Sequence, residues 1–280
     1  MCYIPARLRR LSKRQMDEPE IAANSLFQGV DGEANRILGT SDYRRGPEAR
    51  ALLATPPGRT QGADLAAAAF AIVSRNFSES LSSPARRISK ENWRTHSPHT
   101  EYAANNTSPE TLLERGLVKA CVDAGRKDWW NQVPIASGLV SSTAGRRRAI
   151  DLVHERCCHA FDFVELKVES DSPIYAAIEV MQYGIVWLLT RQAKVALGYT
   201  AGTLLDGDEA NLSVLAPTDF YGNAQLTAFQ NGVSDSLRNI SRSSGARMSF
   251  RFEQFRPDFD ASRKYDGREL CSLLDERESR

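Results

Sequence analysis

A run of strand-like and helix-like patterns from Thr107 to Phe255 constrains the fold of this chain more than any other feature. It opens with Ser108-Pro109-Glu110, a typical helix start with Ser as the N-cap and Pro in the first turn. It closes with Met248 to Phe255, where apolar and polar residues alternate as in a strand. Three strand patterns in a row, followed by alternating helices and strands, predict one mixed sheet with helices on both faces.

The individual elements follow from the spacing of the apolar residues. The spacing predicts strands over 133–140, 149–153, 161–168, 212–216 and 248–255, and helices over 108–125, 174–193 and 223–241. The order is α-β-β-β-α-β-α-β, and the predicted class is α/β.

The segment before this run has a different character. It holds a Pro-Pro pair at 56–57 and a polar run at 94–106, and its two helix-like stretches, 18–38 and 63–75, have no partners nearby in sequence. We therefore expect a weakly structured N-terminal helical arm over 1–105, a folded domain over 106–258 and a charged C-terminal tail over 259–280.

Composition narrows the functional classes. Thirty-six basic and 35 acidic residues give a net charge of +1, so any surface that binds anions must be local. An apolar fraction of 41% excludes wholesale disorder. Five scattered cysteines fit a reducing, cytoplasmic setting, and the absence of a run of about 18 apolar residues predicts no membrane-spanning helix.

Ionisable residues occur inside two of the predicted strands. Asp151 lies between Ile150 and Leu152, and the next strand carries Glu165 and Lys167. Because side chains alternate along a strand, Glu165 and Lys167 project from one face while the other face is apolar. The short connection between the strands makes them neighbours, which predicts that Asp151 lies beside the other two.

These three residue types suit phosphodiester hydrolysis. Two carboxylates can hold a hard divalent cation such as Mg²⁺, which retains several waters. The cation polarises a phosphoryl oxygen and lowers the pKa of a bound water. A neighbouring lysine can orient that water and offset the charge that develops in the transition state.

Asp151, Glu165 and Lys167 match the D…ExK signature, and the chain from Thr107 to Phe255 thereby resembles the PD-(D/E)XK nuclease superfamily. The resemblance implies a restriction-endonuclease-like α-β-β-β-α-β core and Mg²⁺- or Mn²⁺-dependent hydrolysis of DNA. Asp151 and Glu165 would be the metal ligands, and Lys167 would assist the attacking water. Ile150 stands where the motif's name has proline.

Two further residues are placed like members of that superfamily's sites. Glu114 on the first helix is placed like an additional acid near the metal, and Gln182 like a glutamine on the helix that follows ExK. Gln182 is adjacent to Tyr183, a departure from the spacing of the exonuclease-like branch. We predict a catalytic set of Asp151, Glu165, Lys167, Glu114 and Gln182.

The functional hypothesis is therefore a magnesium-dependent deoxyribonuclease with DNA as its partner and no membrane association. A homodimer or a larger complex is left open. The alternative is a non-catalytic module on the same fold that binds nucleic acid or protein. The near-neutral charge favours this alternative slightly, whereas the intact D…ExK set favours the enzyme.

Other motifs have less specific interpretations. His154, Cys157, Cys158 and His159 could ligate zinc, but adjacent cysteines and the lack of a second ligand pair favour a hairpin. Arg146-Arg147-Arg148 fits a solvated turn and a phosphate contact equally well. For Trp129-Trp130, packing over the sheet edge is favoured over stacking on a base.

Overall fold

The computed structural model describes residues 26–82, 88–101, 108–135, 148–169, 172–200 and 203–280. Its centre is an open six-stranded sheet of mixed direction in the order β1-β2-β3-β4-β5-β6. The strands β1, β2 and β3 are antiparallel, β3, β4 and β5 run parallel, and β6 is antiparallel to β5. Their bounds are Trp129–Pro134, Ala149–Cys157, Ala160–Leu166, Glu209–Ala216, Arg247–Gln254 and Glu278–Ser279. The predicted α/β class with a mixed sheet is confirmed.

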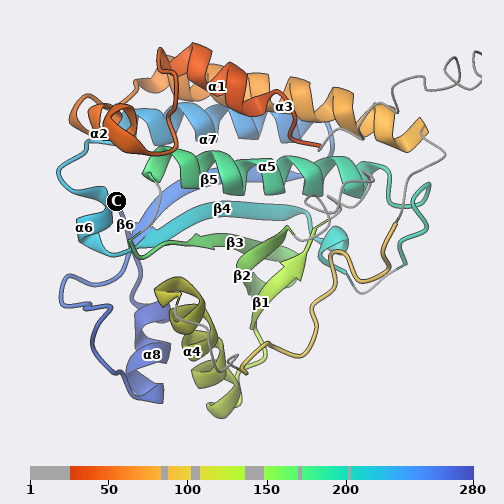
Figure 1. The fold of residues 1–280 in the computed structure, drawn as a ribbon. Helices are drawn as coiled ribbons and strands as arrows, with labels where there is room; N and C mark the ends of the chain where they lie inside the picture. Colours follow the sequence, from red (N-terminus) through yellow and green to blue (C-terminus); the bar gives the residue numbers. More distant parts are fainter. Residues whose placement is uncertain (1–25, 83–87, 102–107, 136–147, 170–171, 201–202) are drawn as a thin grey trace, which may run out of the picture.

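Helices cover both faces of the sheet (Figure 1). The helices α5 and α7 pack on one face, with α1 and α3 outside them, and α4 and α8 lie together against the other face. Their bounds are α1 Val30–Leu38, α2 Gly46–Ala54, α3 Arg59–Ser82, α4 Pro109–Asp123, α5 Pro173–Gln192, α6 Thr218–Tyr221, α7 Thr227–Arg242 and α8 Gly267–Asp275, with a short 3₁₀ turn at Leu204–Asp206.

Local sequence chemistry explains where the two helices next to the candidate site begin. The Ser108 hydroxyl accepts the Thr111 N–H at 3.4 Å, and Ser172 caps α5 in the same way through the Tyr175 N–H at 3.1 Å. A proline occupies the first turn in each case, where its missing N–H costs nothing. The helix start predicted at Ser108-Pro109 is confirmed.

The expected weakly structured arm is wrong for the described part of residues 1–105. Leu26, Leu65 and Val73 are buried in the same hydrophobic core as the sheet. Helix α3 packs against α7, and a Cβ added at Gly232 would overlap the carbonyl oxygen of Arg59. The contacting residues Arg59 and Gly232 lie some 170 positions apart in the sequence. Local apolar spacing therefore could not predict that these helices pack on the core.

The expected charged tail also belongs to the fold. Leu273 and Leu274 of α8 are buried against α4, and β6 extends the sheet at β5. The first strand is shifted from its expected bounds of 133–140 to Trp129–Pro134, and residues 136–140 lie outside the described residues. The domain limits at 105/106 and 258/259 stay predictions.

Helix α5 is the single described helix whose length and composition would let it cross a membrane. In this fold 83% of its most apolar window is buried. Burial of that extent is what the central core helix of a folded domain shows.

Candidate active site

The three residues of the predicted constellation come together where β2 and β3 stop pairing. Leu152 pairs with Val164, and continuing that register by one residue places Asp151 opposite Glu165. The backbone N–H of Lys167 donates to Leu215 O at 3.0 Å, which extends the pairing with β4 just past the end of β3. The predicted proximity of these residues is present in the structure.

Alternation along β3 determines which face carries the site. Val164 and Leu166 pack into the cluster with α4 and α8, whereas Phe163 packs into the larger core on the α5 side. Glu165 and Lys167 share the face of Phe163 and are 4% and 6% exposed. Two ionisable groups are thus buried beneath α5, where an unpaired charge is costly.

Lys167 is held among carboxylates. Its Nζ lies 2.8 Å from Glu165 Oε1 and 3.4 Å from Glu179 Oε2. Burial opposes the charged form, but the Glu165 and Glu179 carboxylates outweigh it and raise the pKa of Lys167 above its usual value. Lys167 is therefore an ammonium at neutral pH.

The carboxylates of Asp151 and Glu165 differ in their hydrogen-bond partners. Asp151 Oδ2 accepts the Leu166 N–H at 3.0 Å, and burial raises the pKa of Asp151 to about 6. Burial, followed by repulsion from Asp151, raises the pKa of Glu165 well above its usual value. Glu165 Oε2 is buried and has no hydrogen-bond partner among the described residues. A buried acceptor that lacks a partner among the described residues, beside a second carboxylate, could accept a bound cation.

Glu114 on α4 reaches the same region from the sheet edge. Asn131 Nδ2 and Gln132 Nε2 each donate to its carboxylate at 2.7 Å. Burial, followed by repulsion from Asp151, raises the pKa of Glu114 to about 7. Glu114 is thus electrostatically coupled to Asp151, as its predicted placement near the metal ligands requires.

Gln132 connects Glu114 to Asp151 and was not predicted. Its Nε2 also lies 3.4 Å from Asp151 Oδ1, so one amide spans both carboxylates. Its φ of 52° is in the left-handed region, which is unusual for a residue inside a strand. The sequence did carry a sign of this role, because the polar residues Asn131 and Gln132 lie inside β1. The predicted bounds of that strand began at residue 133 and left both of them out.

Gln182 and Glu179 lie one turn apart on α5. Arg148 Nη1 donates to Gln182 Oε1 at 3.5 Å and is 4.0 Å from Glu179 Oε1. Gln182 therefore contacts Arg148 and, among the described residues, makes no hydrogen bond to Asp151 or Glu165, whereas Glu179 contacts Lys167 directly. Glu179 was missed, although a polar pair spaced i, i+3 on an otherwise apolar helix marks the buried face that carries it.

The donor set fits a hard divalent cation. All of its candidate ligand atoms are carboxylate oxygens, which Mg²⁺ prefers, and Glu165 Oε2 has no competing donor among the residues that the structure describes. Within the described ranges no group of three or more His, Cys, Asp or Glu side chains is arranged to hold a metal ion. Asp151 and Glu165 would thus supply two ligands and leave the other positions to water and substrate, a common arrangement for Mg²⁺.

The His-Cys hairpin lies on another face and has other contacts. His154 stacks on Trp129 with 4.3 Å between ring centroids and contacts Asp162 Oδ2 at 3.2 Å and Asp128 Oδ2 at 3.4 Å. Cys157 and Cys158 are exposed. Arg277 lies over the Trp129 ring at 5.0 Å, so both the histidine and the arginine cover an indole that would otherwise be open to a base.

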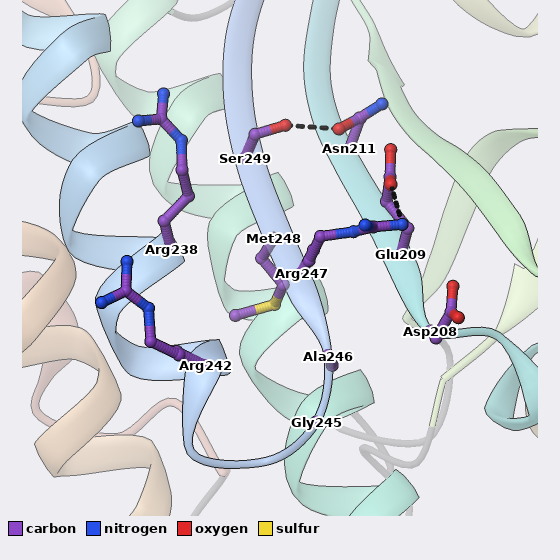
Figure 2. Close-up of a pocket in the computed structure, with 10 residues that line it drawn as sticks. All are labelled: Asp208, Glu209, Asn211, Arg238, Arg242, Gly245, Ala246, Arg247, Met248 and Ser249. Atoms are coloured by element: carbon purple, nitrogen blue, oxygen red, sulfur yellow. Dashed lines mark hydrogen bonds and ion pairs between the residues drawn. The ribbon is translucent and has the colours of Figure 1, made fainter.

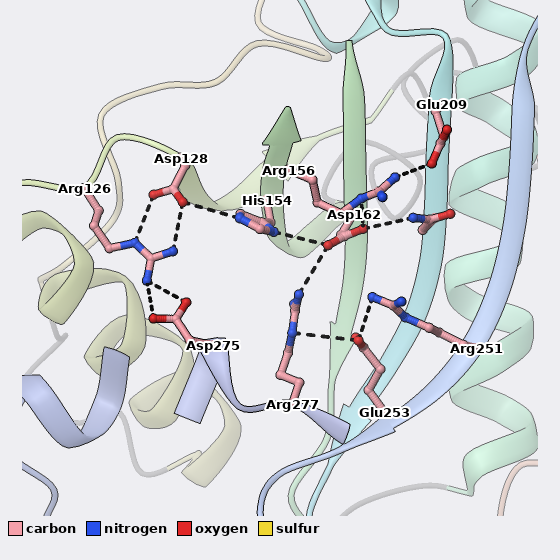
Figure 3. Close-up of polar contacts among 11 residues, drawn as sticks. Arg126, Asp128, His154, Arg156, Asp162, Glu209, Arg251, Glu253, Asp275 and Arg277 are labelled. Carbon is pink, nitrogen blue, oxygen red and sulfur yellow. Dashed lines mark hydrogen bonds and ion pairs between the residues drawn. The ribbon is translucent and has the colours of Figure 1, made fainter. Parts of the chain in front are cut away.

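Asp162 is the centre of a charged network on this face (Figure 3). It is fully buried and contacts Arg156 Nε at 2.8 Å, Arg277 Nη2 at 3.3 Å and His154. Burial opposes ionisation, but the His154 hydrogen bond and the arginines outweigh it and lower the pKa of Asp162. The network joins β2 and β3 to the C-terminal segment and is separate from the Asp151 site.

A cavity of about 610 Å³ opens at the other end of the parallel strands (Figure 2). Arg238 and Arg242 project from α7, while Arg247 reaches toward Glu209 and pairs with it at 2.9 Å. Glu165 pairs with Val214, whereas this cavity begins at Glu209, at the opposite end of β4. None of the predicted catalytic residues lines it.

Arg148 is the described member of the predicted arginine run, and Arg146 and Arg147 lie outside the described residues.

No family model matches the chain, and no curated protein and no solved structure is significantly similar to it.

Proposed function

We propose that this chain is a metal-dependent nuclease that hydrolyses phosphodiester bonds in DNA, on a restriction-endonuclease-like core. One observation carries the proposal: Asp151, Glu165 and Lys167 lie next to one another where the pairing of β2 with β3 ends. There Glu165 Oε2 is buried and has no partner among the described residues. The order of helix α4, strands β1, β2 and β3, helix α5 and strand β4 agrees with the core that the D…ExK resemblance implies.

Asp151 and Glu165 would hold Mg²⁺ or Mn²⁺. When bound, the ion supplies polarisation of the phosphoryl oxygen and a bound water of lowered pKa. Asp151 is fixed by the Leu166 N–H, so its carboxylate does not have to reorient. Lys167, kept cationic by Glu165 and Glu179, donates to the attacking water and offsets the charge on the phosphoryl oxygens.

Cleavage assays on single-stranded, double-stranded and branched DNA test the proposal. Wild type with Mg²⁺ should cut at least one substrate, and Asp151→Asn and Glu165→Gln should each lower the rate by at least about a hundredfold. Asp275→Asn is the matched control, because Asp275 is an exposed acid that pairs with Arg126 on α8's side of the molecule. It should cut like wild type.

Binding measured beside cleavage separates the two candidate functions. Asp151→Asn should bind DNA as tightly as wild type or more tightly, because it removes a negative charge near the phosphate. If wild type binds DNA yet cuts none of the three substrates with either metal, the nuclease proposal is wrong. The non-catalytic binding module, which the net charge of +1 slightly favours, would replace it.

A further inference from the structure

A cavity of about 310 Å³ lies next to the proposed site, between the N-terminal helical layer and α5. One wall is the start of α1 and the residues just before it, with Phe27, Gln28 and Asp31. The other wall is the α5 face with Tyr175 and Gln182. Residues 27–31 close the cavity by packing over the α5 side of the core.

The cavity borders the proposed catalytic residues through Glu179. Glu179 lines it through its side chain and also lies 3.4 Å from Lys167 Nζ. Arg148 lines it as well, 4.0 Å from Glu179 Oε1. A ligand in the cavity thus lies one side chain away from Lys167, the lysine proposed to act on the attacking water.

Arg148 is positioned as a phosphate contact. Its guanidinium carbon lies 4.6 Å from the centroid of the Phe27 ring, so the ring supports the cation from one side. Its contacts with Gln182 and Glu179 are long, at 3.5 and 4.0 Å. A planar guanidinium with five N–H donors suits a phosphate that replaces these contacts.

The remaining wall groups are those that bind a nucleobase. Tyr175 supplies an aromatic ring, and Gln28 and Gln182 supply amides that donate and accept hydrogen bonds. Asp31 accepts the Tyr43 hydroxyl at 2.6 Å and lies 3.5 Å from Arg44 Nη1, and its remaining lone pairs can accept base N–H groups. The volume lies at the lower end of small-molecule sites, which span about 300–1,000 Å³, and so holds one nucleotide but not a base pair.

We infer that this cavity binds one unpaired nucleotide next to the scissile phosphate, so that the substrate is single-stranded or locally unpaired nucleic acid. The inference rests on the proposed function and specifies its substrate class. Arg148 would contact the phosphate, Tyr175 would stack on the base, and Gln28 would contact the base edge. Enzymes that act on bases use extruded nucleotides in pockets of this kind.

Equilibrium binding in EDTA tests the inference without relying on cleavage. The probes are a short fluorescent single strand, the same sequence as a blunt duplex, and that duplex with one bulged nucleotide. Wild type should bind the single strand and the bulged duplex more tightly than the blunt duplex. Tyr175→Leu should weaken binding to the first two by about five- to tenfold and leave the blunt duplex unchanged.

Two further variants keep the test informative. Gln28→Ala alters an exposed side chain and should reproduce the selective loss in smaller measure even if Tyr175→Leu folds poorly. Arg148→Gln should weaken binding to all three probes and reduce the salt dependence by about one phosphate contact. Gln225→Ala, an exposed glutamine outside the cavity, is the control and should match wild type.

The outcomes for cavity and active site are distinguishable. Equal binding of the three probes, with no effect of Tyr175→Leu or Gln28→Ala, overturns the inference even if Asp151-dependent cleavage is observed. Selective binding that depends on Tyr175 and Gln28 supports it, even if no substrate is cut and the nuclease proposal fails.

Discussion

The Asp151 carboxylate takes the place of a backbone acceptor for Leu166, whose N–H lies 3.0 Å from Asp151 Oδ2. The last pair in register between β2 and β3 is Leu152 with Val164, so the side chain bridges the strands where their ladder ends. Asp151 therefore has two separable roles. It satisfies a buried N–H, and it supplies charge to the proposed metal site.

Two substitutions separate these roles. Asp151→Asn keeps an oxygen for the Leu166 N–H and removes a half-buried charge, so unfolding in EDTA should show stability equal to or above that of wild type. Asp151→Ala leaves the N–H buried without its acceptor and should cost about 1–3 kcal/mol. Both should abolish the rise in Tm that Mg²⁺ produces in wild type. Equal urea-unfolding curves for Asn and Ala would contradict the structural role.

Stability of the metal-free protein should fall as pH rises from about 5 to 8. The folded-state pKa is raised to about 7 for Glu114 and about 6 for Asp151, above the unfolded values near 4. The folded state thus binds more protons in this window, and deprotonation there disfavours it. For buried Glu114 the penalty at pH 8 is on the order of 3 kcal/mol.

Glu114→Gln tests that window, because it removes one titrating group and leaves a similar shape. The slope of unfolding free energy against pH between 5 and 8 should become shallower, whatever the absolute stability. The control is Glu79→Gln, an exposed acid on α3. Mg²⁺ should reduce the slope in wild type, since it competes with protons for the carboxylates. An unchanged slope in Glu114→Gln would show that Glu114 does not titrate in this range.

Lys167 should be needed for cleavage and not for metal binding. Lys167→Met removes the ammonium but keeps an unbranched chain in a position that is 6% exposed. Cleavage should fall by about 10²–10³-fold, while the Mg²⁺-induced rise in Tm should persist or grow, because a competing cation beside Glu165 is gone. If Lys167→Met abolishes that rise, the lysine organises the metal site instead of acting on the water.

The elements around the site were predictable because their signals are local. Strand β3 and helix α5 are rich in regularly spaced apolar residues. Because Leu166 lies between Glu165 and Lys167, strand alternation places these two side chains on the same face. Their proximity to Asp151 followed from a short connection. These inferences needed no contact between distant segments.

The missed parts depend on contacts that are distant in sequence. Helix α3 buries small residues such as Gly62 and Ala66, so its sequence shows little of the large apolar content that marks a core helix. These small residues are explained only by the close contact with α7, which the sequence pattern does not reveal. Gln132 acquires its role only through the register of β1 with β2. Glu179 acquires its role only when α5 packs over Lys167.

Close packing between α3 and α7 makes Gly232 intolerant of a side chain. A Cβ there would overlap the Arg59 carbonyl oxygen, and backbone cannot move aside as a flexible side chain can. Gly232→Ala should therefore cost about 1–3 kcal/mol despite its better helix propensity. Gly267→Ala is the control, since its nearest neighbour would be Ala120 Cβ at 4.0 Å. Urea unfolding should show destabilisation for Gly232→Ala alone, and equal behaviour of the two would refute the close approach.

Asp162 should matter for stability and not for the proposed catalysis. Asp162→Ala removes the buried counter-charge that Arg156 and Arg277 share and leaves them only Glu209 and Glu253 among the described residues, which should cost up to about 3–5 kcal/mol. Asp275→Ala breaks an exposed pair with Arg126 and should cost at most about 1 kcal/mol. Because Asp162 lies on the face opposite Glu165, the Mg²⁺-induced rise in Tm should survive, and Asp162→Asn provides the same comparison if the alanine variant does not fold. Loss of the Mg²⁺ response in a folded Asp162 variant would show that the two charged clusters are coupled through β3.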